Sequence, residues 1–159
     1  MDNIIGLTIG TGLGAGIIIN NQLYAGTNCG AGEFGTVDYL ANNYEYYCSG
    51  SFFQNMYQVD GEEVFKNAKK GDPFALKLYE EFGLHLSNVI KLVMYTYDPP
   101  MIILGGSVSL AFNYFKEAMW ERISTFAYTK SISRLQIKTS ELENSALLGA
   151  AALYYNSIK

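Results

Sequence analysis

Glycine and charge are distributed very unevenly along this chain of 159 residues, and this unevenness limits the folds that the chain can adopt. Nine of the 16 glycines lie between Gly6 and Gly35, and the only charged side chains in the first 35 residues are Asp2 and Glu33. Uncharged apolar segments interrupted by glycine are typical of buried strands joined by tight turns. We therefore expect this stretch to form strands of a folded sheet and not a flexible tail.

The first third of the chain predicts three antiparallel strands. Residues 4–9 and 15–19 are apolar runs, and Asn20-Asn21 is a turn dipeptide that leads into a short third strand at residues 23–24. The tyrosine-rich residues 44–47 favour irregular structure.

Two helices further along have clear start and stop signals. Asp60 can cap the first helix, acidic residues fill its first turn and lysines its last, and Gly71 follows its end. Asp72-Pro73 begins the second helix, which ends at Asp98-Pro99-Pro100, and a shorter helix over residues 51–57 precedes both. The buried face of the second helix is predicted from one apolar stripe, formed by Phe74, Leu78, Phe82, Leu86, Ile90 and Val93.

The last third predicts strands at residues 101–104 and 135–138, a helix at residues 110–123 between them, and a final helix capped by Asn144. The complete order is βββαβαβα. Strands that first pair as hairpins and then alternate with helices imply an α/β fold with a mixed sheet and helices packed on it. This is the element order of a ribonuclease-H-like domain.

Composition argues against several classes of partner. The chain carries 11 basic and 15 acidic side chains, and its longest basic run is Lys69-Lys70, so we expect no binding to nucleic acid. No apolar run reaches the ~20 residues of a membrane helix and no basic leader is present, so we expect no membrane contact and a cytoplasmic location. The two cysteines, Cys29 and Cys48, form no CxxC pair, which fits a reducing compartment.

Two glycine sites can approach a phosphate or nucleotide. Gly10-Thr11-Gly12 joins two predicted strands and combines backbone N–H groups with a hydroxyl donor, although a tight β-turn is an equally good explanation. Gly105-Gly106-Ser107 follows a buried strand, where ligands of α/β sheets bind, although an ordinary strand-to-helix loop is the alternative. The presence of both sites in this element order strengthens the interpretation of each as a ligand-binding site.

These segments together resemble the C-terminal lobe of the ROK family of repressors and sugar kinases, within the actin-like, hexokinase-like ATPase superfamily. The resemblance covers nearly the whole chain in the family's order. Its motifs are Gly10 to Ile19, Gly26 to Gly35, Asp98-Pro99, Ile102 to Ser109, and Leu148-Gly149-Ala150-Ala151. It implies that residues 1–159 are a single C-terminal lobe, with the N-terminal lobe outside this chain.

The resemblance assigns ATP with Mg²⁺ to the two glycine sites. Phosphoryl transfer depends mainly on positioning and charge stabilisation, which backbone donors and Mg²⁺ can supply. The assigned residues are Gly10, Thr11 and Gly12 for the β and γ phosphates, and Gly105, Gly106 and Ser107 for the rest of the nucleotide.

The resemblance also implies a hexose site. It assigns Glu33 and Asn28 to the sugar, because a carboxylate can accept two hydroxyl hydrogen bonds; for Glu33 a solvated loop acid is the alternative. Members of the family have a second sugar-binding glutamate, and here Gly50 or Ser51 is expected near its place. Tyrosines 44, 46 and 47 are candidates to fill the vacated volume.

Zinc-containing members of the family have a histidine and three cysteines in this region. Thr36 stands at the position of the histidine and only Cys48 remains of the cysteines, so we expect no zinc or other metal site. His85 is expected to be a surface or interface residue, and Cys29 a small buried one.

The family's first phosphate loop and catalytic aspartate precede the Gly10 turn, so we expect no catalytic residue in this chain. The leading hypothesis is the ATP- and sugar-binding lobe of a hexose kinase that pairs as a homodimer. The alternatives are a non-catalytic sugar-sensing and dimerisation lobe of a transcriptional regulator, and a bare dimerisation module.

Overall fold

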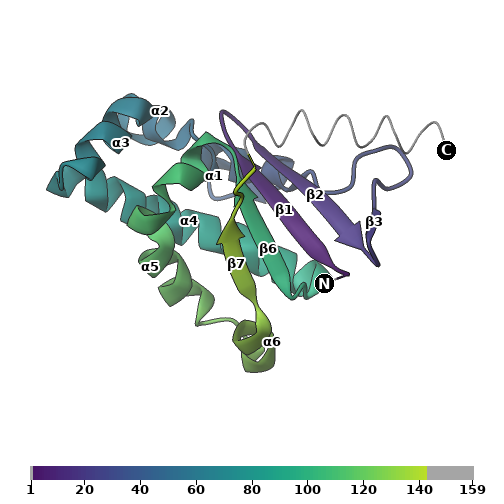
Figure 1. Ribbon diagram of the computed structural model, residues 1–159. Coiled ribbons are helices and arrows are strands. Elements are labelled where there is room, and N and C mark those ends of the chain that lie inside the picture. Colours follow the sequence, from purple (N-terminus) through teal and green to yellow (C-terminus); the bar gives the residue numbers. More distant parts are fainter. Residues whose placement is uncertain (1, 143–159) are drawn as a thin grey trace.

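The computed structural model describes residues 2–142 and contains a five-stranded mixed sheet (Figure 1). Its order is β3-β2-β1-β6-β7. The first three strands pair antiparallel, whereas β6 runs parallel to β1 and β7 parallel to β6, as the sequence predicts. The strands are β1 (Ile4–Ile9), β2 (Leu13–Ile19), β3 (Gln22–Leu23), β6 (Met101–Gly105) and β7 (Gln136–Thr139).

Strand β1 lies at the centre of the sheet and carries the clearest two-residue alternation. Ile5, Leu7 and Ile9 are buried, while Thr8 on the opposite face is exposed. Leu7 pairs with Leu104 of β6, which is also fully buried, so both strands contribute to one core.

Helices cover the buried face of this sheet, and α4 passes behind the strands in Figure 1. Helices α4 and α5 pack so closely that a Cβ on Gly83 would lie 2.5 Å from the backbone oxygen of Phe115. The helices are α1 (Tyr44–Cys48), α2 (Phe52–Tyr57), α3 (Gly61–Lys69), α4 (Pro73–Tyr97), α5 (Phe112–Ile123) and α6 (Thr129–Arg134), with 3-10 turns η1 (Phe34–Thr36) and η2 (Ser107–Ala111).

The predicted helix caps are confirmed. Asp60 accepts a hydrogen bond from the Glu63 amide at 2.9 Å, and Asp72 accepts one from the Ala75 amide at 2.8 Å. Gly71 has a φ of +79°, the conformation in which glycine commonly follows a helix.

Several predictions about individual residues are wrong. The tyrosine-rich segment is the helix α1, because Asn43 caps it by accepting the Tyr46 amide at 2.9 Å. Phe74 is 54% exposed, since it lies in the first turn of α4 beyond the edge of the core, and Cys29 is exposed in its loop. The other five members of the α4 stripe are buried.

The structure adds elements that the sequence did not predict. A small hairpin pairs β4 (Asp38–Tyr39) with β5 (Asn42–Asn43) just before α1, and α6 precedes β7. The helix expected after Asn144 and the motif at Leu148 lie outside the described residues. Within residues 2–142, no helix is long and apolar enough to cross a membrane.

Candidate functional site

Residues from both glycine motifs line one cavity of about 660 Å³, whereas Gly12, Gly105 and Gly106 are not among its lining residues. Gly10 and Thr11 follow β1, and Ser107 follows β6, and all three line this cavity. They converge because β1 and β6 are parallel neighbours, so that their carboxyl ends lie at the same edge of the sheet. The structure thus brings together residues that lie nearly a hundred positions apart in the sequence.

Segment 49–51 supports the Gly10 turn from the side. The Gly50 amide donates to the Gly10 carbonyl at 2.6 Å, and the Ser51 hydroxyl donates to the Thr11 carbonyl at 2.8 Å. The Gly10 amide donates to the Gly12 carbonyl at 3.0 Å, which closes the turn and leaves Thr11 exposed at its tip. Gly10 itself faces open space, since a Cβ there would meet no atom within 4 Å.

The second glycine motif has a steric explanation. Gly106 has a φ of +85°, and a Cβ on it would lie 2.4 Å from the carbonyl oxygen of Ile9. Gly105 is the buried last residue of β6. Gly106 therefore lets the loop after β6 cross close over the end of β1, and this crossing presents Ser107 to the cavity.

The cavity has an apolar wall and a charged rim. Phe53, Tyr79 and Val108 contribute apolar surface, and the burial of Tyr79 raises the pKa of its phenol, which stays neutral. Lys66 and Lys69 of α3 line this cavity together with the acids Asp60 and Glu62, and Lys66 pairs with Glu62 at 3.8 Å. The Lys69 ammonium lies 4.2 Å from the centre of the Phe65 ring. Such a cavity suits a ligand that has an apolar part and a polar part.

A carboxylate lies at the other end of the same turn, beside Gly12 and Leu13. Oε2 of Glu45 accepts a hydrogen bond from the Leu13 amide at 2.9 Å, and a Cβ on Gly12 would lie 2.7 Å from this oxygen. Gly35 also lies beside this side chain, because its Cβ would lie 3.4 Å from Oε2 and 2.6 Å from the Leu13 carbonyl. Gly12 and Gly35 therefore make room for the Glu45 side chain.

Glu45 is the acid that sequence reasoning missed. Gly50 or Ser51 was expected to stand in place of the family's second glutamate. These residues hold the Gly10 turn, and Glu45 of α1 lies beside the same turn. The signal was the capping residue Asn43 followed by an acid in the first turn of α1, which the run of tyrosines obscured.

The remaining predicted sugar residues lie elsewhere. Asn28 and Glu33 are exposed in the loop between β3 and η1, and neither lines the cavity of about 660 Å³. Thr36 bonds the backbone of this loop, since its hydroxyl donates to the Glu33 carbonyl at 2.8 Å.

The potential metal ligands within residues 2–142 do not form a cluster. No three His, Cys, Asp or Glu side chains in that range are placed to hold a metal ion together. Cys48 is buried, and burial raises the pKa of its thiol, so that the thiol is protonated.

His85, which was expected at the surface or at an interface, is largely covered by this chain itself. Its side chain is only 14% exposed and lies among the rings of Tyr39, Tyr47 and Phe52. It faces away from the apolar stripe of α4 but is covered by α1, α2 and the β4–β5 hairpin, which sequence periodicity along α4 cannot reveal.

Comparisons with known proteins agree with this architecture. The sequence model of the ROK family matches residues 1–157. The chain is 26% identical over 181 residues to a glucokinase from Pyrobaculum calidifontis and 26% identical over 168 residues to the xylose repressor of Bacillus subtilis. These alignments cover 99% and 96% of this chain but only 59% and 44% of the two relatives.

A solved structure has the same fold. The crystal structure of a ROK family protein from Streptococcus pneumoniae TIGR4 in complex with sucrose superposes with a TM-score of 0.74 at 25% identity. The match covers 92% of this chain and 55% of that one. This chain therefore spans little more than half the length of the kinase and of the sucrose-bound protein that it matches.

Proposed function

Because this chain belongs to the ROK family, we propose that it is the ATP- and sugar-binding lobe of a sugar kinase. The observation that carries the proposal is the convergence of Gly10, Thr11 and Ser107 on one cavity, with the Glu45 carboxylate bound to Leu13 at the other end of the same turn. A kinase needs a nucleotide site and an acceptor site separated by the width of a phosphate. The Gly10–Gly12 turn separates these two surfaces.

The nucleotide is proposed to occupy the cavity as its magnesium complex. The apolar wall at Phe53 and Val108 would receive the base, and the backbone and hydroxyl of Thr11 would contact the phosphates. Mg²⁺ bound to ATP would neutralise charge on the phosphates when the nucleotide binds. Of the two lysines that line the cavity, Lys66 is paired with Glu62, so Lys69 is proposed to supply the positive charge for the anionic nucleotide.

The sugar is proposed to lie on the other side of the turn. Glu45 has one oxygen engaged by the Leu13 amide, which orients the carboxylate and leaves its other oxygen to accept a hydroxyl hydrogen bond. Glu33 and Asn28 would supply further hydrogen bonds to a hexose. We assign no catalytic base to residues 2–142; in the proposed kinase the base belongs to the other lobe.

The proposal predicts separable losses of nucleotide and sugar affinity. Isothermal titration of this chain, and of the full-length protein that contains it, would measure the affinity for AMPPNP with Mg²⁺ and for glucose. Thr11→Ala should weaken nucleotide binding about tenfold, and Glu45→Ala and Glu33→Ala should each weaken glucose binding by at least about tenfold, because each removes a hydrogen bond to a charged or polar group.

Glu80→Ala is the matched control, since Glu80 is an exposed acid on α4 away from both sites. Unchanged affinities in all three site variants would contradict the proposed roles. In the full-length protein, glucose-dependent ATP turnover should fall in parallel with the binding losses.

A second candidate function is a sugar-sensing lobe of a transcriptional regulator. The similarity to the xylose repressor over 96% of this chain favours it. A regulator of this kind would bind sugar without requiring a nucleotide, so glucose binding together with an absence of AMPPNP binding would select this alternative. We further propose that the protein is cytoplasmic. We also propose that the lobe forms a homodimer, and sedimentation at several concentrations would test this oligomeric state.

A further inference from the structure

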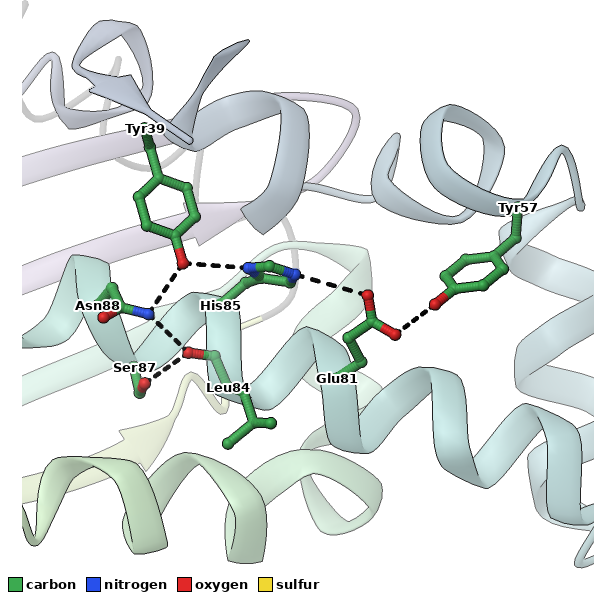
Figure 2. Close-up of polar contacts among 7 residues, drawn as sticks. All are labelled: Tyr39, Tyr57, Glu81, Leu84, His85, Ser87 and Asn88. Atoms are coloured by element: carbon green, nitrogen blue, oxygen red, sulfur yellow. Dashed lines mark hydrogen bonds and ion pairs between the residues drawn. The ribbon is translucent and has the colours of Figure 1, made fainter. Parts of the chain in front are cut away.

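A continuous chain of polar contacts joins the β4–β5 hairpin and α2 to helix α4 (Figure 2). Asn88 donates to the hydroxyl of Tyr39 at 3.0 Å, and that hydroxyl contacts Nδ1 of His85 at 3.1 Å. On the other side of the ring, Nε2 of His85 lies 3.6 Å from Glu81, whose second oxygen accepts the hydroxyl of Tyr57.

The donors along this chain define one tautomer of His85. The Tyr39 oxygen already accepts a hydrogen bond from Asn88, so its own proton is free to be donated to Nδ1. Nδ1 is then an acceptor, and the ring proton is carried by Nε2, which faces the Glu81 carboxylate. The contacts are thus complete with a neutral imidazole.

Aromatic rings enclose the histidine and its tyrosine partner. Tyr39 stacks on Tyr44 with ring centroids 4.4 Å apart and meets Tyr47 edge-on at 5.5 Å. Tyr47 and Phe52 lie 5.1 Å and 5.7 Å from the His85 ring. In this setting the Tyr39–His85 bond is shielded from water, which strengthens it relative to a surface hydrogen bond.

Along the sequence, the hairpin held by this bond lies between Glu33 and Glu45, the two acids proposed to bind the sugar. Glu33 precedes η1, whose Phe34 packs edge-on against Tyr97 near the end of α4. The hairpin follows, and the Tyr44 amide donates to the Val37 carbonyl at 3.0 Å as the chain enters α1, which carries Glu45. Tyr39 is therefore the contact with α4 in the middle of this segment.

We propose that the Tyr39–His85 hydrogen bond is a positioning contact that fixes the hairpin on α4 and so holds the Glu33 and Glu45 carboxylates at the sugar site. The inference rests on the proposed sugar site and adds to it the residues that set its geometry. His85 and Tyr39 act through the hairpin and do not touch the sugar themselves.

Glucose titrations of four variants test this role. Tyr39→Phe removes only the hydroxyl, and His85→Phe keeps a ring in the aromatic cluster; each should weaken glucose binding about fivefold to tenfold and change AMPPNP affinity by less than about twofold. His85→Gln should recover most of the loss, because its amide can accept from Tyr39 and donate to Glu81. Asp72→Ala removes the cap of α4 away from the hairpin, so it should lower thermal stability and leave glucose affinity unchanged.

A spectroscopic readout separates positioning from stability. His85 is the only histidine in the sequence, so its imidazole signals in a ¹⁵N-labelled chain need no assignment. They should report the Nε2–H tautomer and should shift when glucose is added.

Wild-type glucose affinity in both Tyr39→Phe and His85→Phe would overturn this inference and leave the proposed function standing. A loss in Asp72→Ala as large as the loss in Tyr39→Phe would overturn it too, because stability alone would then account for the effect. A wild-type full-length protein that binds no glucose would overturn the proposed sugar site, and this inference with it.

Discussion

At the scale of single residues, the glycines of the two motifs have different physical reasons to be glycine. Gly106 is required by the fold, because its φ is positive and a Cβ at this position would collide with the Ile9 backbone. Gly10 is not, since its Cβ would enter open space at the cavity. The sequence presents both as similar Gly-rich turns, and only the packing distinguishes them.

This difference predicts opposite phenotypes. Gly10→Ala should leave the free energy of unfolding nearly unchanged and lower AMPPNP affinity about tenfold, because the added methyl group would enter the proposed phosphate site. Gly106→Ala should destabilise the fold by roughly 3 kcal/mol or more, from left-handed strain together with overpacking. Denaturant unfolding and nucleotide titration of both variants would check this. A stable Gly106→Ala protein, or an unfolded Gly10→Ala protein, would contradict it.

Among candidate site residues, sequence reasoning identified those that follow strands and missed the one on a short helix. Gly10, Thr11 and Ser107 were found because strands end visibly in glycine motifs, and the cavity unites them. Glu45 was missed because a helix of five residues is too short to show periodicity and depends on its cap and on tertiary packing.

At the scale of elements, the long helices were predictable and the small hairpin was not. Helices α3 and α4 begin and end at their predicted caps, since capping is a local interaction of adjacent residues. The β4–β5 hairpin has two-residue strands, and its position depends on Tyr39 reaching His85, which lies 46 residues further along the chain. No local pattern encodes such a contact.

The close packing of α4 against α5 predicts that a methyl group added at Gly83 destabilises the fold. Gly83→Ala raises helix propensity by about 1 kcal/mol, but its Cβ would press against the Phe115 carbonyl, and overpacking of this kind typically costs about 1–3 kcal/mol. We expect net destabilisation in thermal unfolding. Lys77→Ala, at an exposed position of the same helix, is the control and should be nearly neutral. An increase in stability for Gly83→Ala would show that the helices can separate without penalty.

At the scale of the whole molecule, His85 links protonation to global stability. Burial lowers the pKa of His85 below its usual value near 6.5, an effect that the nearby Glu81 carboxylate partly opposes. The unfolded chain therefore binds the proton more tightly than the folded chain. The contribution of His85 to stability is complete above about pH 6.5 and is lost as the pH falls through the lowered folded pKa.

The expected result is a free energy of unfolding that decreases below pH 6.5, with a slope from this one site of at most about 1.4 kcal/mol per pH unit. The groups that face His85 are Glu81 and the rings of Tyr39 and Tyr47. Burial raises the pKa of Tyr39 to about 12, so its phenol stays neutral throughout this range. Urea unfolding of wild type and His85→Phe between pH 5 and 8 would isolate the effect. Parallel curves for the two proteins would contradict it.

The order of the central strands determines how the chain can reach its native state. The β1–β2 hairpin closes between near neighbours, but β1 must also pair with β6, and Ile5 meets Ile102. Closing a loop of about 100 residues is entropically costly and slows folding. During synthesis the first hairpin must wait with one edge uncovered until β6 leaves the ribosome, so this strand edge is the surface through which newly made chains are most exposed to misassociation.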